Sequence, residues 1–223
     1  AFIKELQNFL YSEIKTKNYF DAYNRSQAIA REEFDGDVSS LVGEAKGIVV
    51  PLHPEVVRMV ENNDLVGALK YIGSMGTGRI PALAKKFATL LTDVDIGVMD
   101  FNNPSAAMQK IAKATNTNLA DNSGVYLTDN KGIKVIMLDA NTGLDVWTLL
   151  HEASHAVTQA TLRNKSHPLT KQLTQLFEEV KDSLGTAYGA ERVSDFASEA
   201  HSNPVFRQAL AGINPKGEKI TAL

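Results

Sequence analysis

The chain of 223 residues contains no cysteine, one tryptophan and no excess of positive charge. The missing cysteines exclude disulfide bonds and thiolate metal sites, so a transition-metal site here would have to use histidine and carboxylate ligands. The formal net charge of -3, from 23 basic and 26 acidic residues, disfavours nucleic-acid binding as the main activity. No apolar run approaches the length of a membrane span, and we expect no signal peptide from the pattern of the sequence. We therefore expect neither a nucleic-acid nor a membrane partner.

The composition suits a folded domain, because 43% of the residues are hydrophobic and the chain is long enough to bury one good core with a smaller helical lobe. The sequence starts at Ala1 rather than at a methionine. We therefore expect the chain to be part of a larger polypeptide.

Hydrophobic periodicity predicts a helical N-terminal region over residues 1–90, either a packed extension or a small lobe. Its expected helices cover 1–35, 55–59, 65–72 and 81–91. The glycine-rich turn 73–78 lacks the Gly-Lys-Ser/Thr ending of a phosphate loop and follows no strand. We therefore interpret it as a connection between helices.

The region 91–223 has the pattern of an α+β domain, in which a small mixed sheet precedes long helices. We expect a strand over 94–99, a helix over 105–114 and a hairpin of strands 125–127 and 133–138. A long helix should begin near 142 or 145 and end at 163, and further helices are expected over 169–184 and 193–210. Asn203-Pro204 predicts a bend or break in the last helix.

The motif with the clearest chemistry is His151-Glu152-Ala153-Ser154-His155, which matches HExxH within an apolar segment of helical pattern. Residues four apart share one face of a helix, so both imidazoles can bind one metal ion. Glu152 stands beside the first histidine, where its carboxylate can reach a water on that ion. This combination is typical of zincins and predicts a Zn²⁺ site with Glu152 as general base.

A catalytic zinc needs a third protein ligand and a position for water. The chain is not a metzincin, because Thr158 and Thr161 occupy the positions of that class's glycine and third histidine. Asp195 and Glu199 lie four apart on a later helix and share a face. One can bind the metal while the other hydrogen-bonds a ligand histidine, and the spacing alone leaves open which does which.

Two other histidines follow the motif. His167 lies in the polar stretch 164–168, and we interpret it as a solvated loop residue. We interpret His201 as a polar surface residue, although both could in principle approach a metal.

Tyr188-Gly189 and the run Asp195-Phe-Ala-Ser-Glu199-Ala resemble the closing motif of the gluzincins related to anthrax lethal factor and the clostridial Pro-Pro endopeptidases. In that family a catalytic tyrosine precedes a metal-binding glutamate by seven residues. The run 199–206 is also similar to the "EA-x-SNP-x-F" phrase of zincin domains in large polyvalent phage proteins. The resemblance covers about residues 90–210.

The resemblance implies a zincin-like fold in which Tyr188 is catalytic, Asp195 is the third metal ligand and Glu199 contacts a ligand histidine. The chain departs from the family at Asp195, where the family has glutamate, one methylene longer. Glu199 therefore remains the alternative third ligand. A phage-type context would further imply a protein packaged in the virion and delivered into the bacterial cytoplasm.

Together, the motif and the resemblance predict a zinc metallopeptidase with a peptide or protein substrate. Glu152 would be its general base, and Tyr188 would donate a hydrogen bond to the oxyanion. The strand 133–138 is expected to pair with an extended substrate by strand addition. One alternative is a weak or inactive zincin domain with a structural or binding role in a larger virion or toxin protein. A helical interaction module with a fortuitous HExxH is another.

Overall fold

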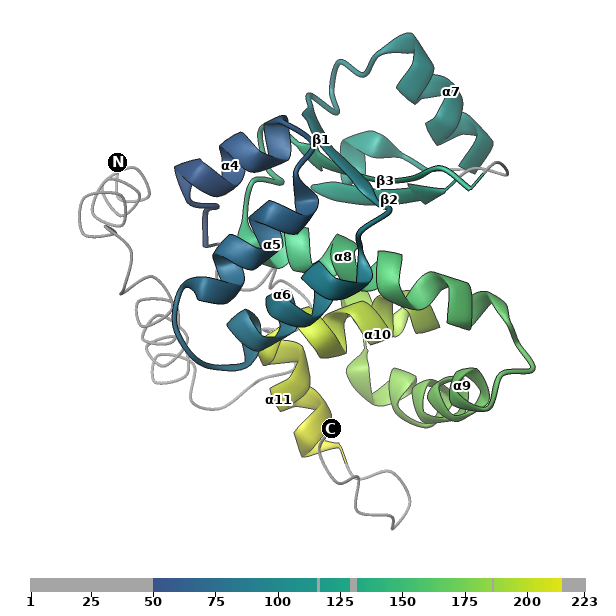
Figure 1. Ribbon diagram of the computed structural model, residues 1–223. Helices are drawn as coiled ribbons and strands as arrows, with labels where there is room; N and C mark the ends of the chain where they lie inside the picture. The colour runs from purple at the N-terminus through teal and green to yellow at the C-terminus, as the bar shows by residue number, and fades with distance from the viewer. Residues whose placement is uncertain (1–49, 116, 129–131, 186, 214–223) are drawn as a thin grey trace, which may run out of the picture.

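The computed structural model describes residues 50–115, 117–128, 132–185 and 187–213, so the helix predicted over 1–35 lies outside the described residues. Within the described ranges the fold is α+β, as expected, with eight α-helices and one three-stranded mixed sheet (Figure 1). The helices are α4 Pro54–Glu61, α5 Leu65–Ser74, α6 Arg79–Leu90, α7 Ala106–Thr115, α8 Val146–Arg163, α9 Pro168–Val180, α10 Val193–Ser202 and α11 Pro204–Gly212. The strands are β1 Asp95–Met99, β2 Gly124–Thr128 and β3 Lys134–Asp139. None of the described helices is long and apolar enough to cross a membrane.

The sheet has the order β1-β3-β2, with β1 parallel and β2 antiparallel to the central strand β3. The pairing of β2 with β3 confirms the predicted hairpin. The expectation that 133–138 pairs with a substrate is wrong, because both edges of β3 are already hydrogen-bonded to neighbouring strands.

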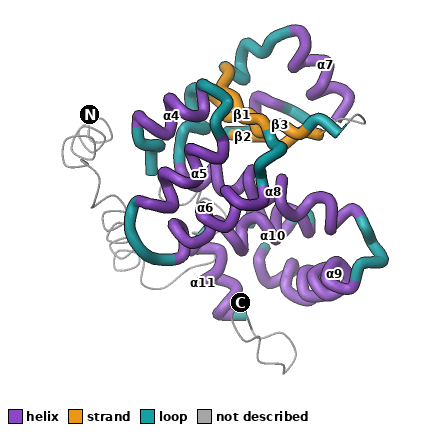
Figure 2. Tube along the Cα trace, in the orientation of Figure 1, coloured by secondary structure: helices purple, strands orange, loops and turns teal. Residues whose placement is uncertain are grey.

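Helices cover both faces of the sheet, with α7 on one side and α8 on the other (Figure 2). Side chains of β3 alternate between the two sides. Ile136 and Leu138 pack with α8 and α4–α6, whereas Val135 and Met137 pack with the cluster that contains α7. This double coverage explains why the strand is a nearly continuous apolar run.

Helices α4, α5 and α6 share their hydrophobic core with β1, β3 and α8. The predicted boundary at residue 90 falls at the end of α6. The division into regions 1–90 and 91–223 stays a prediction, and residues 1–49 of the first region lie outside the described ranges.

A second hydrophobic core, with three phenylalanine rings in edge-to-face contact, holds the C-terminal helices together. Phe196 of α10 packs edge-on against Phe177 of α9 and Phe206 of α11, with ring centroids 5.6 and 5.8 Å away. The helix expected over 169–184 ends earlier, at Val180, and tightens into a 3-10 turn over Lys181–Leu184. The predicted break at Asn203-Pro204 is confirmed, because Asn203 caps α11.

The turn between β3 and α8 sets where α8 begins. Asp145 caps the helix by accepting hydrogen bonds from the Thr148 backbone N–H at 2.9 Å and from its hydroxyl at 2.6 Å. Gly143 lies so close to the chain before β2 that an added Cβ would stand 1.9 Å from the Ser123 carbonyl oxygen and 2.7 Å from the Asp139 nitrogen. Only glycine fits there without a backbone shift.

We predict that Gly143→Ala lowers the free energy of unfolding by at least about 2 kcal/mol, because backbone atoms must move to admit the methyl group. Urea unfolding measures the change. Gly97→Ala is the matched control, since its Cβ would meet only the flexible end of Met137 at 3.2 Å. Equal, small effects of the two substitutions would contradict this view of the turn.

Candidate metal centre

Helix α8 brings the two motif histidines together at one point. The Nε2 atoms of His151 and His155 are 3.0 Å apart, and their rings pack edge to face with centroids 4.7 Å apart. His151 is only 2% exposed, and His155 is partly buried. The helical spacing of four residues therefore produces the shared face expected from the sequence.

Helix α10 crosses α8 and adds a carboxylate to this pair (Figure 1). Asp195 Oδ1 lies 3.5 Å from His155 Nε2, and the donor atoms of His151, His155 and Asp195 all lie within 4.8 Å of one another. In a tetrahedral zinc site, ligand atoms at ordinary bond lengths are about 3.3 to 3.6 Å apart. The three donors therefore fit a transition-metal ion bound by two nitrogens and one oxygen.

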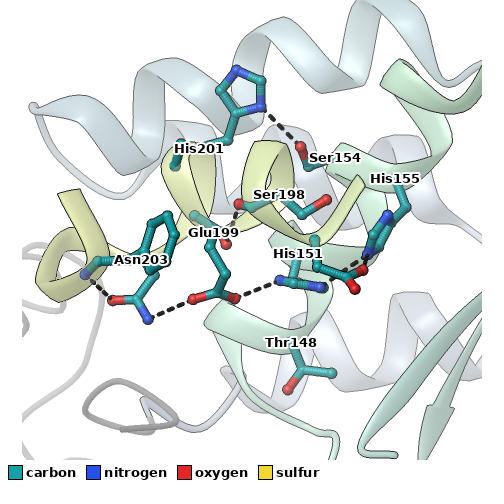
Figure 3. A network of polar contacts seen from close by, with 12 residues as sticks. Thr148, His151, Ser154, His155, Ser198, Glu199, His201 and Asn203 are labelled. Carbon is teal, nitrogen blue, oxygen red and sulfur yellow. Dashed lines mark hydrogen bonds and ion pairs between the residues drawn. The ribbon is translucent and has the colours of Figure 1, made fainter. Parts of the chain in front are cut away.

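Glu199 contacts the opposite nitrogen of His151. Its Oε1 lies 2.8 Å from His151 Nδ1, and its Oε2 accepts a hydrogen bond of 2.7 Å from the Asn203 side-chain amide (Figure 3). Neither His151 Nδ1 nor Glu199 Oε1 has another hydrogen-bond partner among the described residues. We infer that Nδ1 carries the proton and that Nε2 keeps its lone pair for a metal. The geometry thus favours Asp195 as metal ligand and Glu199 as the residue that orients His151.

The electrostatics of the cluster also suit a cation. Burial, together with His151 and Arg192, lowers the pKa of His155 to about 3, so this imidazole is neutral at physiological pH. Burial alone would lower the pKa of His151, but Glu199, Glu152 and Asp195 raise it above the ordinary value. Three buried carboxylates around two imidazoles favour a positive charge among them.

Arg192 fixes the orientation of Asp195. Its Nε donates a hydrogen bond of 2.9 Å to Asp195 Oδ2, which leaves Oδ1 on the side of His155. Burial raises the pKa of Asp195, while Arg192 acts in the opposite direction. The sequence reasoning missed Arg192, although its position three residues before Asp195 at a helix start is a recognisable signal.

Glu152 lies where Gly124 of β2 packs against α8. A Cβ added to Gly124 would meet Thr148 Cγ2 at 2.7 Å and Glu152 Cγ at 2.9 Å, so a glycine is needed beside the carboxylate. Burial raises the pKa of Glu152 to about 7, although His151 and a hydrogen bond from the Tyr126 backbone N–H lower it. The carboxylate is thereby held in place beside the histidines.

Tyr188 approaches the cluster from the turn before α10. Its ring centroid is 5.6 Å from that of His151, and the side chain is 43% exposed. Burial, with Asp195 and Glu152 adding to it, raises the pKa of the phenol, so Tyr188 remains a hydrogen-bond donor at neutral pH. The following Gly189 has no room for a side chain, because a Cβ would lie 2.5 Å from Phe206 Cζ.

A cleft of about 1030 Å³ opens in front of these groups, between β2, α8, α9 and the segment 188–195. Glu152, His155, Tyr188 and Asp195 line it together. The structure thus brings four of the predicted site residues to one cleft, whereas His151 and Glu199 are buried and do not line it.

The two histidines that follow the motif, His167 and His201, lie outside the group of donors. His167 caps α9, where its ring accepts a hydrogen bond of 3.3 Å from the Leu169 backbone N–H. His201, interpreted from the sequence as a polar surface residue, is partly buried. Its Nδ1 is hydrogen-bonded to the Ser154 hydroxyl at 2.9 Å (Figure 3). Burial lowers the pKa of this imidazole.

Comparison with protein-family models, with curated proteins and with solved structures finds no match for this chain. The assignment of function therefore depends on the residues and their geometry.

We predict that Asp195→Asn weakens zinc binding by more than about 100-fold, because a metal ligand is lost. Glu199→Gln should cost about 10- to 100-fold, because only the orientation of His151 suffers. Titration with zinc in a competing chelator measures both constants. Glu191→Gln, an exposed residue in the same segment, is the control and should bind zinc as the wild type does. A larger loss with Glu199→Gln would exchange the two roles.

Proposed function

We propose that this chain is a zinc-dependent endopeptidase of the zincin type. The main observation behind the proposal is that the donor atoms of His151, His155 and Asp195 lie together, and that His155, Asp195 and the neighbouring Glu152 line a cleft large enough for a peptide. The HExxH motif and the resemblance to gluzincins support the same reaction class.

The donor set by itself does not select one metal, because two histidines and a carboxylate also suit Fe(II). Glu152 favours zinc, since a glutamate directly after the first of two helical histidines is the arrangement of zinc hydrolases. Bound there, zinc would polarise a peptide carbonyl and lower the pKa of a water molecule toward neutrality.

Glu152 would carry out the proton transfers of the reaction. It would accept a proton from the water that attacks the peptide carbonyl and then donate that proton to the leaving amine. The contact with the Tyr126 backbone and the packing against Gly124 hold the carboxylate in a fixed position for both steps.

Tyr188 would act on the substrate oxygen. Its phenol would donate a hydrogen bond to the oxyanion, an interaction that is strongest in the transition state. The substrate itself would run beside β2, because residues 124–126 line the cleft and β2 lies at the edge of the described sheet. In this proposal β2, and not β3 as expected from the sequence, is the strand that pairs with the substrate.

A zincin domain without proteolysis, kept for a structural or binding role in a larger virion or toxin protein, would share the same metal site. Metal content therefore does not separate it from a peptidase, whereas peptide cleavage does. Cleavage of a mixed peptide library by the zinc-loaded protein is the deciding experiment.

We predict that Glu152→Gln lowers the rate of peptide cleavage about 10²- to 10⁴-fold, the usual contribution of a general base, while zinc binding is retained. Library cleavage followed by mass spectrometry, with zinc content measured on the same sample, tests this. Undiminished cleavage by the variant would remove Glu152 from the mechanism, and zinc binding without any wild-type cleavage would favour the non-proteolytic domain.

We predict that Tyr188→Phe lowers kcat by about 10² to 10³ and leaves KM nearly unchanged, because the lost hydrogen bond forms mainly in the transition state. Steady-state kinetics on one substrate from the library separate the two constants. Tyr71→Phe is the control, since Tyr71 hydrogen-bonds His53 outside the residues that line the cleft. A rise in KM alone would make Tyr188 a substrate-binding residue instead.

A further inference from the structure

The cleft carries an uneven distribution of charge. Its acidic lining residues are Glu152 and Asp195, both already assigned to the metal centre. Its basic lining residues are Arg163, Lys165, Lys171 and Arg192. This excess of cations contrasts with the chain as a whole, which has a net charge of -3.

Three of these cations come from one short connection, the end of α8 and the start of α9. Arg163 is the last residue of α8, Lys165 follows it in the loop, and Lys171 lies in the first turn of α9. The connection is held by the His167 cap and by a hydrogen bond of 2.9 Å from the Thr170 hydroxyl to the Thr161 carbonyl. These three positively charged residues therefore lie on or beside a turn that is held by hydrogen bonds.

Arg163, Lys165 and Lys171 are exposed, and none of them forms an ion pair with a described residue. Arg192 differs, because its Nε is already bonded to Asp195. Unpaired charges of one sign on a concave surface add their fields and attract a ligand of the opposite sign. The remaining lining is mostly neutral and polar, so these cations are the main charged groups that the cleft offers outside the metal centre.

We propose that the cleft selects peptides that carry an acidic side chain on the part that lies beside the connection formed by Arg163, Lys165 and Lys171. The inference deepens the proposed peptidase function and rests on it. An acidic peptide fits better than a nucleic acid, because three of the four cations that line the cleft come from one short connection and the chain is acidic overall.

The test measures equilibrium binding to the zinc-loaded Glu152→Gln variant, which leaves the peptides intact. The probes are three fluorescent pools of mixed peptides that differ only in one fixed residue: glutamate, glutamine or lysine. We expect the glutamate pool to bind about tenfold more tightly than the glutamine pool and the lysine pool to bind most weakly, with the differences shrinking at high salt.

Adding Arg163→Glu and Lys171→Glu to this variant should reverse the order of the three pools. The matched control adds Lys70→Glu and Lys110→Glu, the same change of charge at two exposed residues outside the cleft lining, and should keep the original order. Equal binding of the three pools, absence of binding, or tighter binding of a single-stranded oligonucleotide would each overturn the inference.

Cleavage of the same pools by the wild type separates the two proposals. Cleavage without a preference for glutamate would retain the peptidase and reject the acidic specificity. A preference for glutamate in binding without zinc-dependent cleavage would retain the specificity of the cleft and reject the peptidase.

Discussion

The crossing of α8 and α10 is the contact on which the candidate site depends. The other faces of these helices belong to different hydrophobic cores, α8 to the core shared with the sheet and α10 to the core of phenylalanines. Where the two helices meet, the buried residues are largely polar: His151, Ser154, Asp195, Ser198 and Glu199. A polar contact of this kind between two helices is stable only if its buried polar groups are paired. A cation bound between α8 and α10 would complete this pairing and link the two hydrophobic cores.

Close backbone approaches place this polar contact beside the cleft. Gly143 lets the turn before α8 contact the chain before β2, Gly124 lets β2 lie against Glu152, and Gly189 lets the Tyr188 turn pack on Phe206. Each glycine stands where a Cβ would collide with a neighbouring element. The position of the site thus depends on small residues whose role cannot be seen in the HExxH motif itself.

Local features of the fold could be predicted from the sequence, because helix starts and stops are encoded by nearby residues such as Asp145 and Asn203. The shared face of His151 and His155 follows from helical spacing alone. The central place of β3 could not be predicted, since it depends on pairing with β1 about forty residues earlier. Asn203 was recognised as a break but not as the partner of Glu199, and Arg163, Lys165 and Lys171 gain their meaning only from the cleft they line.

The most direct test of a metal centre built by α8 and α10 is a crystal structure of the zinc-soaked protein with anomalous diffraction on both sides of the zinc absorption edge. We expect one strong anomalous peak per chain, about 2.0 to 2.2 Å from His151 Nε2, His155 Nε2 and an oxygen of Asp195, with Glu199 still on His151 Nδ1. A peak elsewhere, or no peak between the two helices, would contradict the account.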